Sequence, residues 1–304
     1  MNGNMKIMSE DHILEINNLV KYYGKFKALN KVNINVKSGT VHGFLGPNGA
    51  GKTTTIRIIF NILKPTSGEV KLFGIPINRK TVYLHERIGY IPGDVSLYGH
   101  LNVKQMLEYF ASLRPNRPSD RMEEIVEKFD LDLTKSTKTL SKGNRQKVAI
   151  VQAFMHDPDF YIFDEPSSGL DPLMQQLLYD TIINEAKKGK TFFISSHILP
   201  EIQKVSETIS IIRKGEIVST VDVSKLEEQI VHKIFINFSN EIDPSVLEDD
   251  KIKVLAKEGK KVSLLVSGNY SKLLGQLSTM PIEDIHAPVP SLEDYFMHFY
   301  STDE

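Results

Sequence analysis

The chain has 304 residues, of which 40% are hydrophobic and 25% are charged. This composition is typical of a globular protein and fits one large domain or two unequal domains. It contains no cysteine, which excludes disulfides and thiolate metal sites. The first residues lack the apolar stretch of a secretory signal, and no apolar run approaches the roughly 20 residues that span a bilayer. We therefore expect any role at a membrane to depend on a partner protein.

The formal net charge of −1 is unevenly distributed along the chain. Residues 225–304 carry a net charge of −6, and the remaining residues carry +5. An acidic segment is a poor ligand for phosphate backbones, so we expect no nucleic-acid partner. Ordinary solvated surface charge is the simpler interpretation of the imbalance.

The N-terminal two thirds of the sequence alternate between strand and helix patterns. Residues 13–19 and 32–36 alternate apolar and polar side chains, as half-buried strands do. A short apolar run over 40–45 precedes a glycine-rich loop, and a helical pattern follows over 52–63. Alternation of this kind predicts a mainly parallel sheet covered on both faces. Further strands are predicted at 67–73, 87–91, 160–163, 191–195, 209–213 and 216–221, and further helices at 102–129 (interrupted by Pro115 and Pro118), 141–155 and 173–186.

The glycine-rich loop fits the phosphate-binding pattern G-x4-G-K-[ST], and it stands between a strand and a helix as that pattern requires. Its glycines allow successive backbone N–H groups to face one phosphate chain, and the helix N-terminus adds a positive dipole end. Lys52 is expected to reach the β- and γ-phosphates, and the Thr53 hydroxyl to bind Mg²⁺. The predicted nucleotide-binding residues here are Gly46, Pro47, Asn48, Gly49, Ala50, Gly51, Lys52, Thr53 and Thr54.

Two carboxylates end the apolar strand predicted at 160–163. Side chains alternate along a strand, so Asp164 and Glu165 are expected to point in different directions. We assign Asp164 to Mg²⁺, through water, and Glu165 to the catalytic water at the γ-phosphate. A surface acidic pair is the alternative, but its position after a phosphate-binding loop in an α/β pattern favours catalysis.

The segment Leu140-Ser-Lys-Gly-Asn144 resembles the LSGGQ signature of the ABC ATPase family. The resemblance covers residues 14–221, with the motifs in the family's order. It implies that Ser141, Gly143 and Asn144 contact the nucleotide of a second subunit. A serine and glycine amides at a helix N-terminus do form an anion site, which supports that role.

The resemblance assigns three more residues to ATP. Tyr23, before Gly24, matches the aromatic residue that stacks on adenine. Asp171 ends Ser168-Gly-Leu-Asp171, which matches the D-loop, and His197 matches the switch histidine that contacts the γ-phosphate. Each of these matches is weak alone, and their order along the chain gives them weight.

The family resemblance also implies fold and partners. It implies an α/β P-loop NTPase of the ABC type, with a mainly parallel sheet core, an antiparallel β subdomain and a helical subdomain. Two subunits, most simply a homodimer, would meet head to tail around ATP and Mg²⁺. They would drive a separate membrane permease from the cytoplasmic face of the membrane, as peripheral subunits of an exporter. The alternatives are a soluble ABC ATPase acting on ribosomes or nucleic acid, and a P-loop enzyme outside the family, such as a kinase.

The sequence departs from the family pattern at Gly93 and in the segment Lys142-Gly-Asn144, which stands in place of Gly-Gly-Gln. Gly93 stands where the family usually has a glutamine that binds Mg²⁺, and we hypothesise that the adjacent Asp94 contributes to the metal instead. A solvent-exposed Asp94 is the equal alternative. Lys142 replaces a signature glycine and is expected to add positive charge near the phosphates.

Residues 13–222 are expected to form the ATP-binding domain and residues 223–304 a small α+β accessory domain. The final helix at 291–296 follows a serine N-cap and resembles the end of exporter-type ATPases. The accessory domain is interpreted either as a dimer-contacting or regulatory module or as a unit that only packs on its own core. Its other predicted elements are strands at 233–238, 254–256 and 261–266 and a helix at 270–277.

Overall fold

The computed structural model describes residues 12–113, 120–224, 231–267 and 270–288. The chain divides into two compact units, residues 1–220 and residues 221–304, and each is described by itself. The strands of the first unit are β1 (His12–Tyr23), β2 (Phe26–Lys37), β3 (Val41–Leu45), β4 (Ser67–Leu72), β5 (Ile75–Pro76), β6 (Ile88–Ile91), β7 (Phe160–Asp164), β8 (Thr191–Ser196), β9 (Thr208–Arg213) and β10 (Glu216–Asp222). Its helices are α1 (Lys52–Ile59), α2 (Val103–Ser112), α3 (Asp120–Lys128), α4 (Lys142–Phe154), α5 (Pro172–Lys187) and α6 (Leu199–Val205).

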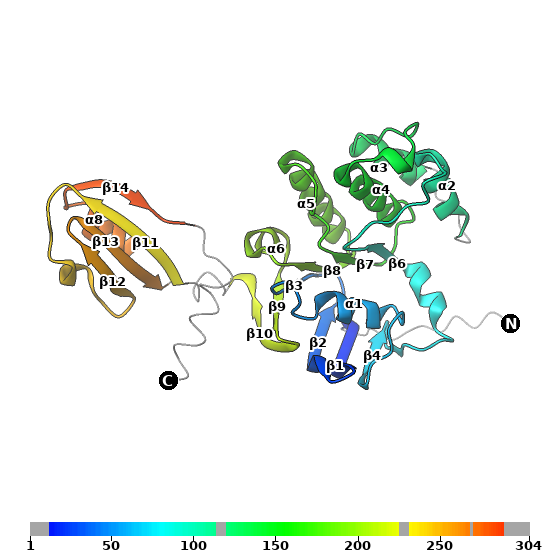
Figure 1. The fold of residues 1–304 in the computed structure, drawn as a ribbon, viewed down its shortest axis with the longest axis horizontal. Coiled ribbons are helices and arrows are strands. Elements are labelled where there is room, and N and C mark those ends of the chain that lie inside the picture. The colour runs from blue at the N-terminus through cyan, green and yellow to red at the C-terminus, as the bar shows by residue number, and fades with distance from the viewer. Residues whose placement is uncertain (1–11, 114–119, 225–230, 268–269, 289–304) are drawn as a thin grey trace. The chain divides into compact units, whose positions relative to one another are not determined.

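The first unit contains a six-stranded sheet of order β10-β9-β3-β8-β7-β6 (Figure 1). Strands β3, β6, β7, β8 and β9 pair in parallel, which confirms the predicted mainly parallel core. Every residue of β3, β7 and β8 is buried, because helices or a second sheet cover both faces. Continuous apolar runs such as Phe160–Phe163 are therefore required, rather than an alternating pattern.

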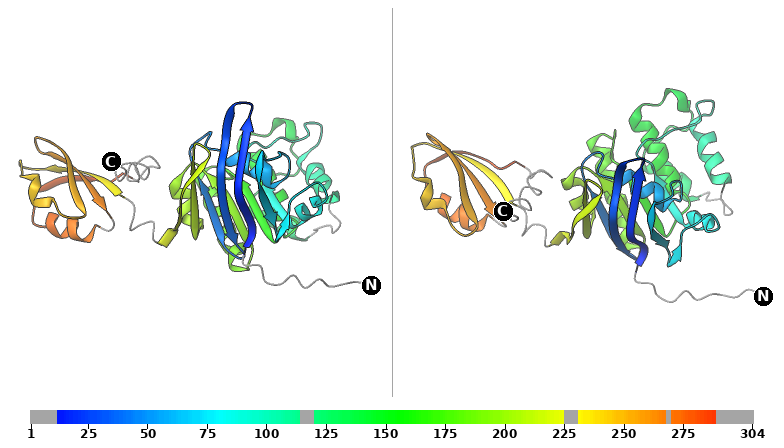
Figure 2. Two further views of the ribbon diagram at one scale, coloured as in Figure 1. Left: turned by 90° about the horizontal axis from the view of Figure 1, so that it is seen from below. Right: turned by 60° about the horizontal axis from the view of Figure 1, so that its bottom comes forward.

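A second, antiparallel sheet of order β2-β1-β4-β5 lies beside the first (Figure 2). Helix α1 packs between this sheet and β7, and Leu14, Ile56 and Phe160 belong to the resulting core. On the other face of the parallel sheet, the rings of Tyr161 and Phe192 stack with centroids 4.5 Å apart. Phe154 of α4 covers Tyr161 at 4.8 Å, so each face of the parallel sheet has its own apolar core.

The helix boundaries differ from two predictions. The helix expected over 52–63 ends at Ile59, because the chain turns at Asn61, whose φ is 52°. The helical stretch expected over 102–129 is two helices, α2 and α3, and residues 114–119 between them lie outside the described residues. Helix α2 begins with a reciprocal cap, in which the Asn102 side chain accepts the Gln105 N–H and the Gln105 side chain accepts the Asn102 N–H.

The second unit is a four-stranded antiparallel sheet of order β12-β13-β11-β14 with one helix, α8. Three of its strands and its helix were predicted, whereas the edge strand β14 was not. Strand β14 is mostly exposed, so its sequence lacks the apolar pattern of a buried strand. The helix predicted at 291–296 lies outside the described residues. The elements are β11 (Val231–Phe238), β12 (Ile252–Glu258), β13 (Lys261–Ser267), α8 (Ser271–Leu277) and β14 (Ile282–His286).

Within the described residues, no helix is both long and apolar enough to span a membrane. The longest, α5, has 16 residues and carries charged side chains.

Buried His42 predicts a stability change on acidification. His42 in β3 is 2% exposed, its Nε2 lies 2.9 Å from Ser210 Oγ of β9, and burial lowers its pKa from 6.5 to about 4. The unfolded chain therefore binds a proton between pH 6.5 and 4 that the folded chain does not bind, so stability falls as the pH falls. We expect urea unfolding to show a loss of about 2 kcal/mol from this residue between pH 7 and pH 5.

The matched control for this prediction is His42→Gln, which removes the titrating group but keeps a polar side chain. The variant should be less stable at pH 7 and should lose less stability between pH 7 and pH 5 than the unsubstituted chain does. An identical pH dependence in both proteins would contradict the assignment to His42.

Candidate functional site

The glycine-rich loop connects β3 to α1 at the carboxyl end of the parallel sheet (Figure 1). Gly49 and Gly51 have φ values of 80° and 115°, a region that side chains with a Cβ avoid. Gly46 packs so closely on β9 that an added Cβ would lie 2.3 Å from the carbonyl oxygen of Ile212. Backbone conformation and packing thus account for the glycine at all three positions.

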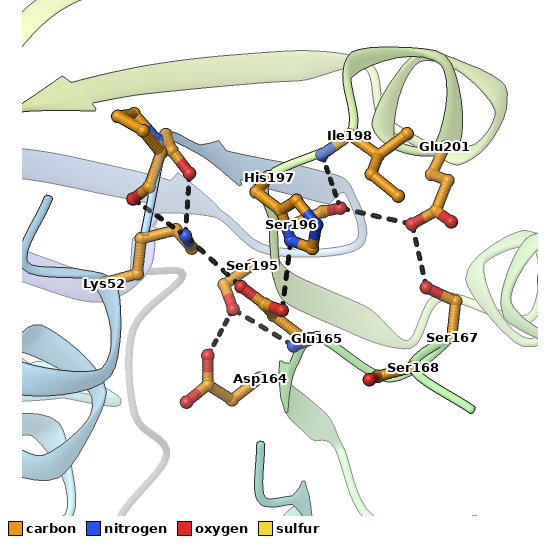
Figure 3. Close-up of polar contacts among 12 residues, drawn as sticks. Lys52, Asp164, Glu165, Ser167, Ser168, Ser195, Ser196, His197, Ile198 and Glu201 are labelled. Carbon is orange, nitrogen blue, oxygen red and sulfur yellow. Dashed lines mark hydrogen bonds and ion pairs between the residues drawn. The ribbon is translucent and has the colours of Figure 1, made fainter. Parts of the chain in front are cut away.

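Lys52, in the first turn of α1, is 5% exposed and curls back over the loop. Its Nζ donates to the carbonyl oxygens of Gly46, at 2.7 Å, and Pro47, at 3.2 Å. The same Nζ lies 3.3 Å from Glu165 Oε1, and Figure 3 shows these three contacts converging on the ammonium. A buried cation above a curled loop matches the chemistry of a polyphosphate site.

Asp164 ends β7 and is 1% exposed. Its carboxylate accepts hydrogen bonds from the hydroxyls of Thr53, at 2.8 Å, and Ser195. Carboxylate and hydroxyl oxygens are ligands that suit Mg²⁺. No group of three or more His, Asp or Glu side chains in the described ranges is arranged to hold a metal ion. Thr53 and Asp164 therefore offer oxygen ligands for a cation at this point.

The carboxylate of Glu165 points to different partners from that of Asp164 (Figure 3). Its Oε1 faces Lys52, and its Oε2 lies 3.1 Å from Nδ1 of His197. The residue has a φ of 51°, and its N–H donates to the carbonyl oxygen of Ser195 at 3.1 Å. A strained backbone held by the neighbouring strand gives Glu165 a fixed place between a cation and an imidazole.

Ser195 and Glu201 are site residues that the sequence analysis missed. Ser195 donates to Asp164, and the carboxylate of Glu201 accepts from Ser167, at 2.8 Å, and from Ser196, at 3.2 Å (Figure 3). The only sequence signal was the pair of serines directly before His197 at the end of a buried strand. These hydrogen bonds connect the ends of β7 and β8.

The signature and D-loop residues begin helices. Ser141 is the N-cap of α4 and accepts the Asn144 N–H at 3.2 Å, and Asp171 is the N-cap of α5 and accepts the Met174 N–H at 3.0 Å. Gly143, in the first turn of α4, lies close to the D-loop, because an added Cβ would be 2.7 Å from the carbonyl oxygen of Gly169.

Tyr23 lies at the end of β1 and is 45% exposed. Nζ of Lys21 lies 5.3 Å from the centroid of its ring. Within the described ranges, no hydrogen bond joins Tyr23 or Ser141 to the cluster of Lys52, Asp164 and Glu165. The chain thus presents these groups separately from that cluster.

Position 93 lies against the carboxylate at the end of β7. A Cβ added to Gly93 would be 3.2 Å from Asp164 Oδ2. The neighbouring Asp94 is exposed. Its contribution to a metal ion stays a prediction.

Comparisons with known proteins place the chain in a family. The sequence model of the ABC transporter family matches residues 29–168. The chain is 31% identical over 294 residues to the bacitracin transport ATP-binding protein BcrA of Bacillus licheniformis, a match that covers 94% of this chain and 96% of BcrA. The chain belongs to the ATP-binding proteins of ABC transporters. The predicted family is confirmed, and because the match covers 94% of the chain, it extends into the second unit.

Other members of the ABC family give the same result. The chain is 33% identical over 226 residues to BcrA of Enterococcus faecalis, with 73% of each protein covered. The solved structure of an ATP-binding subunit of an ABC transporter superposes with a TM-score of 0.66 at 29% identity, covering 71% of this chain and 92% of that one. A dimeric ATP-binding cassette bound to ADP and Pi superposes with a TM-score of 0.61 at 25% identity, covering 69% and 98%. The ABC-type P-loop fold is therefore confirmed.

The close packing of Gly46 predicts a destabilised variant. Gly46→Ala places a Cβ against rigid backbone of β9, so we expect the free energy of unfolding to fall by about 1–3 kcal/mol. Urea unfolding at constant pH measures this change. Gly49→Ala is the matched control, because its Cβ would meet nothing within 4 Å and the positive φ alone costs about 1 kcal/mol. An equal or smaller loss for Gly46→Ala than for Gly49→Ala would contradict the packing argument.

Proposed function

We propose that this chain is the ATP-hydrolysing subunit of an ABC exporter, and that it works as a dimer with a separate membrane permease. The observation that carries the proposal is the cluster at the carboxyl end of the parallel sheet. There a buried lysine, a hydroxyl–carboxylate pair and a glutamate between a lysine and a histidine lie beside a phosphate-binding loop.

The loop and Lys52 bind the phosphates of ATP. Backbone N–H groups of the glycine-rich loop would face the phosphate chain, and the Lys52 ammonium would neutralise charge on the β- and γ-phosphates. Thr53 and Asp164 would hold Mg²⁺, which supplies further positive charge to those oxygens.

Glu165 orients water for attack on the γ-phosphorus. In the described structure its carboxylate is paired with the Lys52 ammonium. Phosphates that bind this ammonium would displace the carboxylate of Glu165, which is then free to accept a hydrogen bond from water. The water oxygen then bonds to phosphorus, a water proton passes to the carboxylate, and the bond to the β–γ bridging oxygen breaks. We assign His197, whose Nδ1 lies 3.1 Å from Oε2 of Glu165, to holding this carboxylate and to contacting the γ-phosphate.

The second half of the site comes from another copy of the chain. The N-terminus of α4, with Ser141, Gly143 and Asn144, leaves backbone N–H groups that suit an anion. Asp171 and Tyr23 are assigned to ATP, with the Tyr23 ring stacked on adenine. The dimeric cassette bound to ADP and Pi, to which the fold is similar, supports a two-copy arrangement.

The transporter role is favoured over a ribosome- or nucleic-acid-bound ATPase. The similarity to BcrA, named as a bacitracin transport ATP-binding protein, covers nearly the full length of both chains. We extend this role to the chain as export through a permease, which places it on the cytoplasmic face of the membrane.

An exposed aromatic surface, formed by α2 and the segment before it, is our candidate for permease contact. Tyr98 and Tyr109 are 52% and 39% exposed, and their rings meet edge to face at 5.6 Å. Leu113 is exposed near the end of the same helix. Tyrosine is enriched at the centres of protein interfaces, so the pair of tyrosines carries this assignment. The exposed leucine adds nothing to it, because single exposed apolar residues are normal on protein surfaces.

The first test of the proposal replaces the catalytic carboxylate. Glu165→Gln keeps the shape of the side chain but removes the base and weakens the pairing with Lys52. We expect ATP hydrolysis to fall by about 100-fold or more, with ATP binding retained and a stable ATP-bound dimer in size-exclusion chromatography.

Glu207→Gln, an exposed residue before β9, is the matched control and should hydrolyse ATP normally. Hydrolysis by Glu165→Gln at the unsubstituted rate would refute the assignment of the base. No detectable hydrolysis by the unsubstituted chain, alone and with its permease, would refute the function.

The second test addresses the permease. Tyr98→Ser combined with Tyr109→Ser should abolish co-purification with the permease from detergent-solubilised membranes and leave hydrolysis by the isolated chain within about twofold of normal. Val218→Ser on β10, which also removes an exposed apolar side chain, is the control and should still co-purify. Retention of the double variant on membranes would show that the permease binds elsewhere.

A further inference from the structure

Lys142 departs from the family signature and makes a contact that the sequence did not suggest. Its Nζ donates to Oγ of Ser168 at 2.7 Å. Ser168 lies in the loop 166–170, which directly follows the catalytic glutamate. A side chain expected near the phosphates of a second copy is therefore attached to the loop of its own chain.

The first turn of α4 and this loop also pack against each other. Gly169 has a φ of 82°, and a Cβ added there would be 2.9 Å from Cγ and Cδ of Lys142. Since an added Cβ at Gly143 would also meet the carbonyl oxygen of Gly169, both glycines are needed for the approach. The aliphatic part of Lys142 thus lies over Gly169 while its ammonium reaches Ser168.

The same loop is fixed at further points. Buried Gln146 of α4 donates from Nε2 to the carbonyl oxygen of Pro166 at 2.8 Å. The N–H of Ser168 donates to the carbonyl oxygen of Glu165 at 3.1 Å, which closes a turn directly on the glutamate. A short series of contacts therefore runs from the N-terminus of α4, through Lys142 and the loop, to Glu165.

We propose that Lys142 is a positioning residue that ties the loop 166–170 to the first turn of α4. Phosphates of a second copy, arriving at that turn, would then shift the loop and with it the carboxylate of Glu165. This inference rests on the proposed function. It differs from direct phosphate binding by Lys142, since the ammonium acts through Ser168.

The test is a double-substitution cycle measured on the full chain. Lys142→Ala and Ser168→Ala should each lower kcat for ATP by about three- to tenfold and change KM by less than about twofold. The double variant should be no slower than the single variants, because both remove one interaction. Lys142→Arg keeps a donor of similar length and should recover part of kcat.

The matched control is Lys147→Ala, which removes the same charge from the same helix and should leave kcat and KM unchanged. A KM raised by about tenfold in Lys142→Ala, with Ser168→Ala unaffected, would show that Lys142 binds phosphate directly. Independent, multiplying effects of the two substitutions would also overturn the proposal.

Amide hydrogen exchange separates this inference from the proposed function, because it needs no hydrolysis. In the nucleotide-free full chain, Lys142→Ala and Ser168→Ala should each speed exchange at residues 168–170, and Lys147→Ala should not. Unchanged exchange overturns the tie whether or not the chain hydrolyses ATP. Faster exchange with kcat unchanged shows a tie that does not position Glu165, and this outcome also overturns the proposal.

Discussion

The site depends on the burial of a single cation, the ammonium of Lys52. Removing a charge from water costs several kcal/mol unless oxygen partners replace the lost hydration. Here the carbonyl oxygens of Gly46 and Pro47 and the carboxylate of Glu165 replace it. The positive φ angles of Gly49 and Gly51 curl the loop that carries those carbonyls. The buried cation and the curled loop therefore require each other, and together they leave a place where phosphates compete with Glu165.

The parallel sheet brings the remaining groups to that cation. Strands β3, β8 and β7 are consecutive in the parallel sheet, so the loops at their carboxyl ends meet. These loops are distant along the chain, because more than a hundred residues separate β3 from β7. Asp164 pairs directly with Ser195 across the ladder, which explains the hydroxyl beside the carboxylate. The loop after Glu165 is then held from the other side by α4. The same short segment thus connects the hydrolytic cluster to the helix that we propose faces a second nucleotide.

Local sequence patterns predicted much of this arrangement. Apolar runs predicted the buried strands, and the glycine spacing with Lys52 and Thr53 predicted the loop, because both depend on neighbours within a few residues. Strand alternation predicted that Asp164 and Glu165 point in different directions, but Glu165 lies beyond the end of β7, and its φ of 51° sets its direction. The edge strand β14 escaped prediction, since an exposed edge needs no apolar face. The end of α1 at Ile59 was also missed, because no glycine or proline marks it.

The sequence by itself determined the family, the fold class and the identity of the phosphate loop, because these are encoded in contiguous motifs. Only the tertiary structure decided which distant side chains meet. It placed Ser195 on Asp164, left Asp94 exposed, and joined Lys142 to Ser168 of its own chain. Such contacts depend on the order of strands in the sheet and on how α4 packs beside it. Residue spacing along the chain does not fix that order, so local patterns could not reveal those partners.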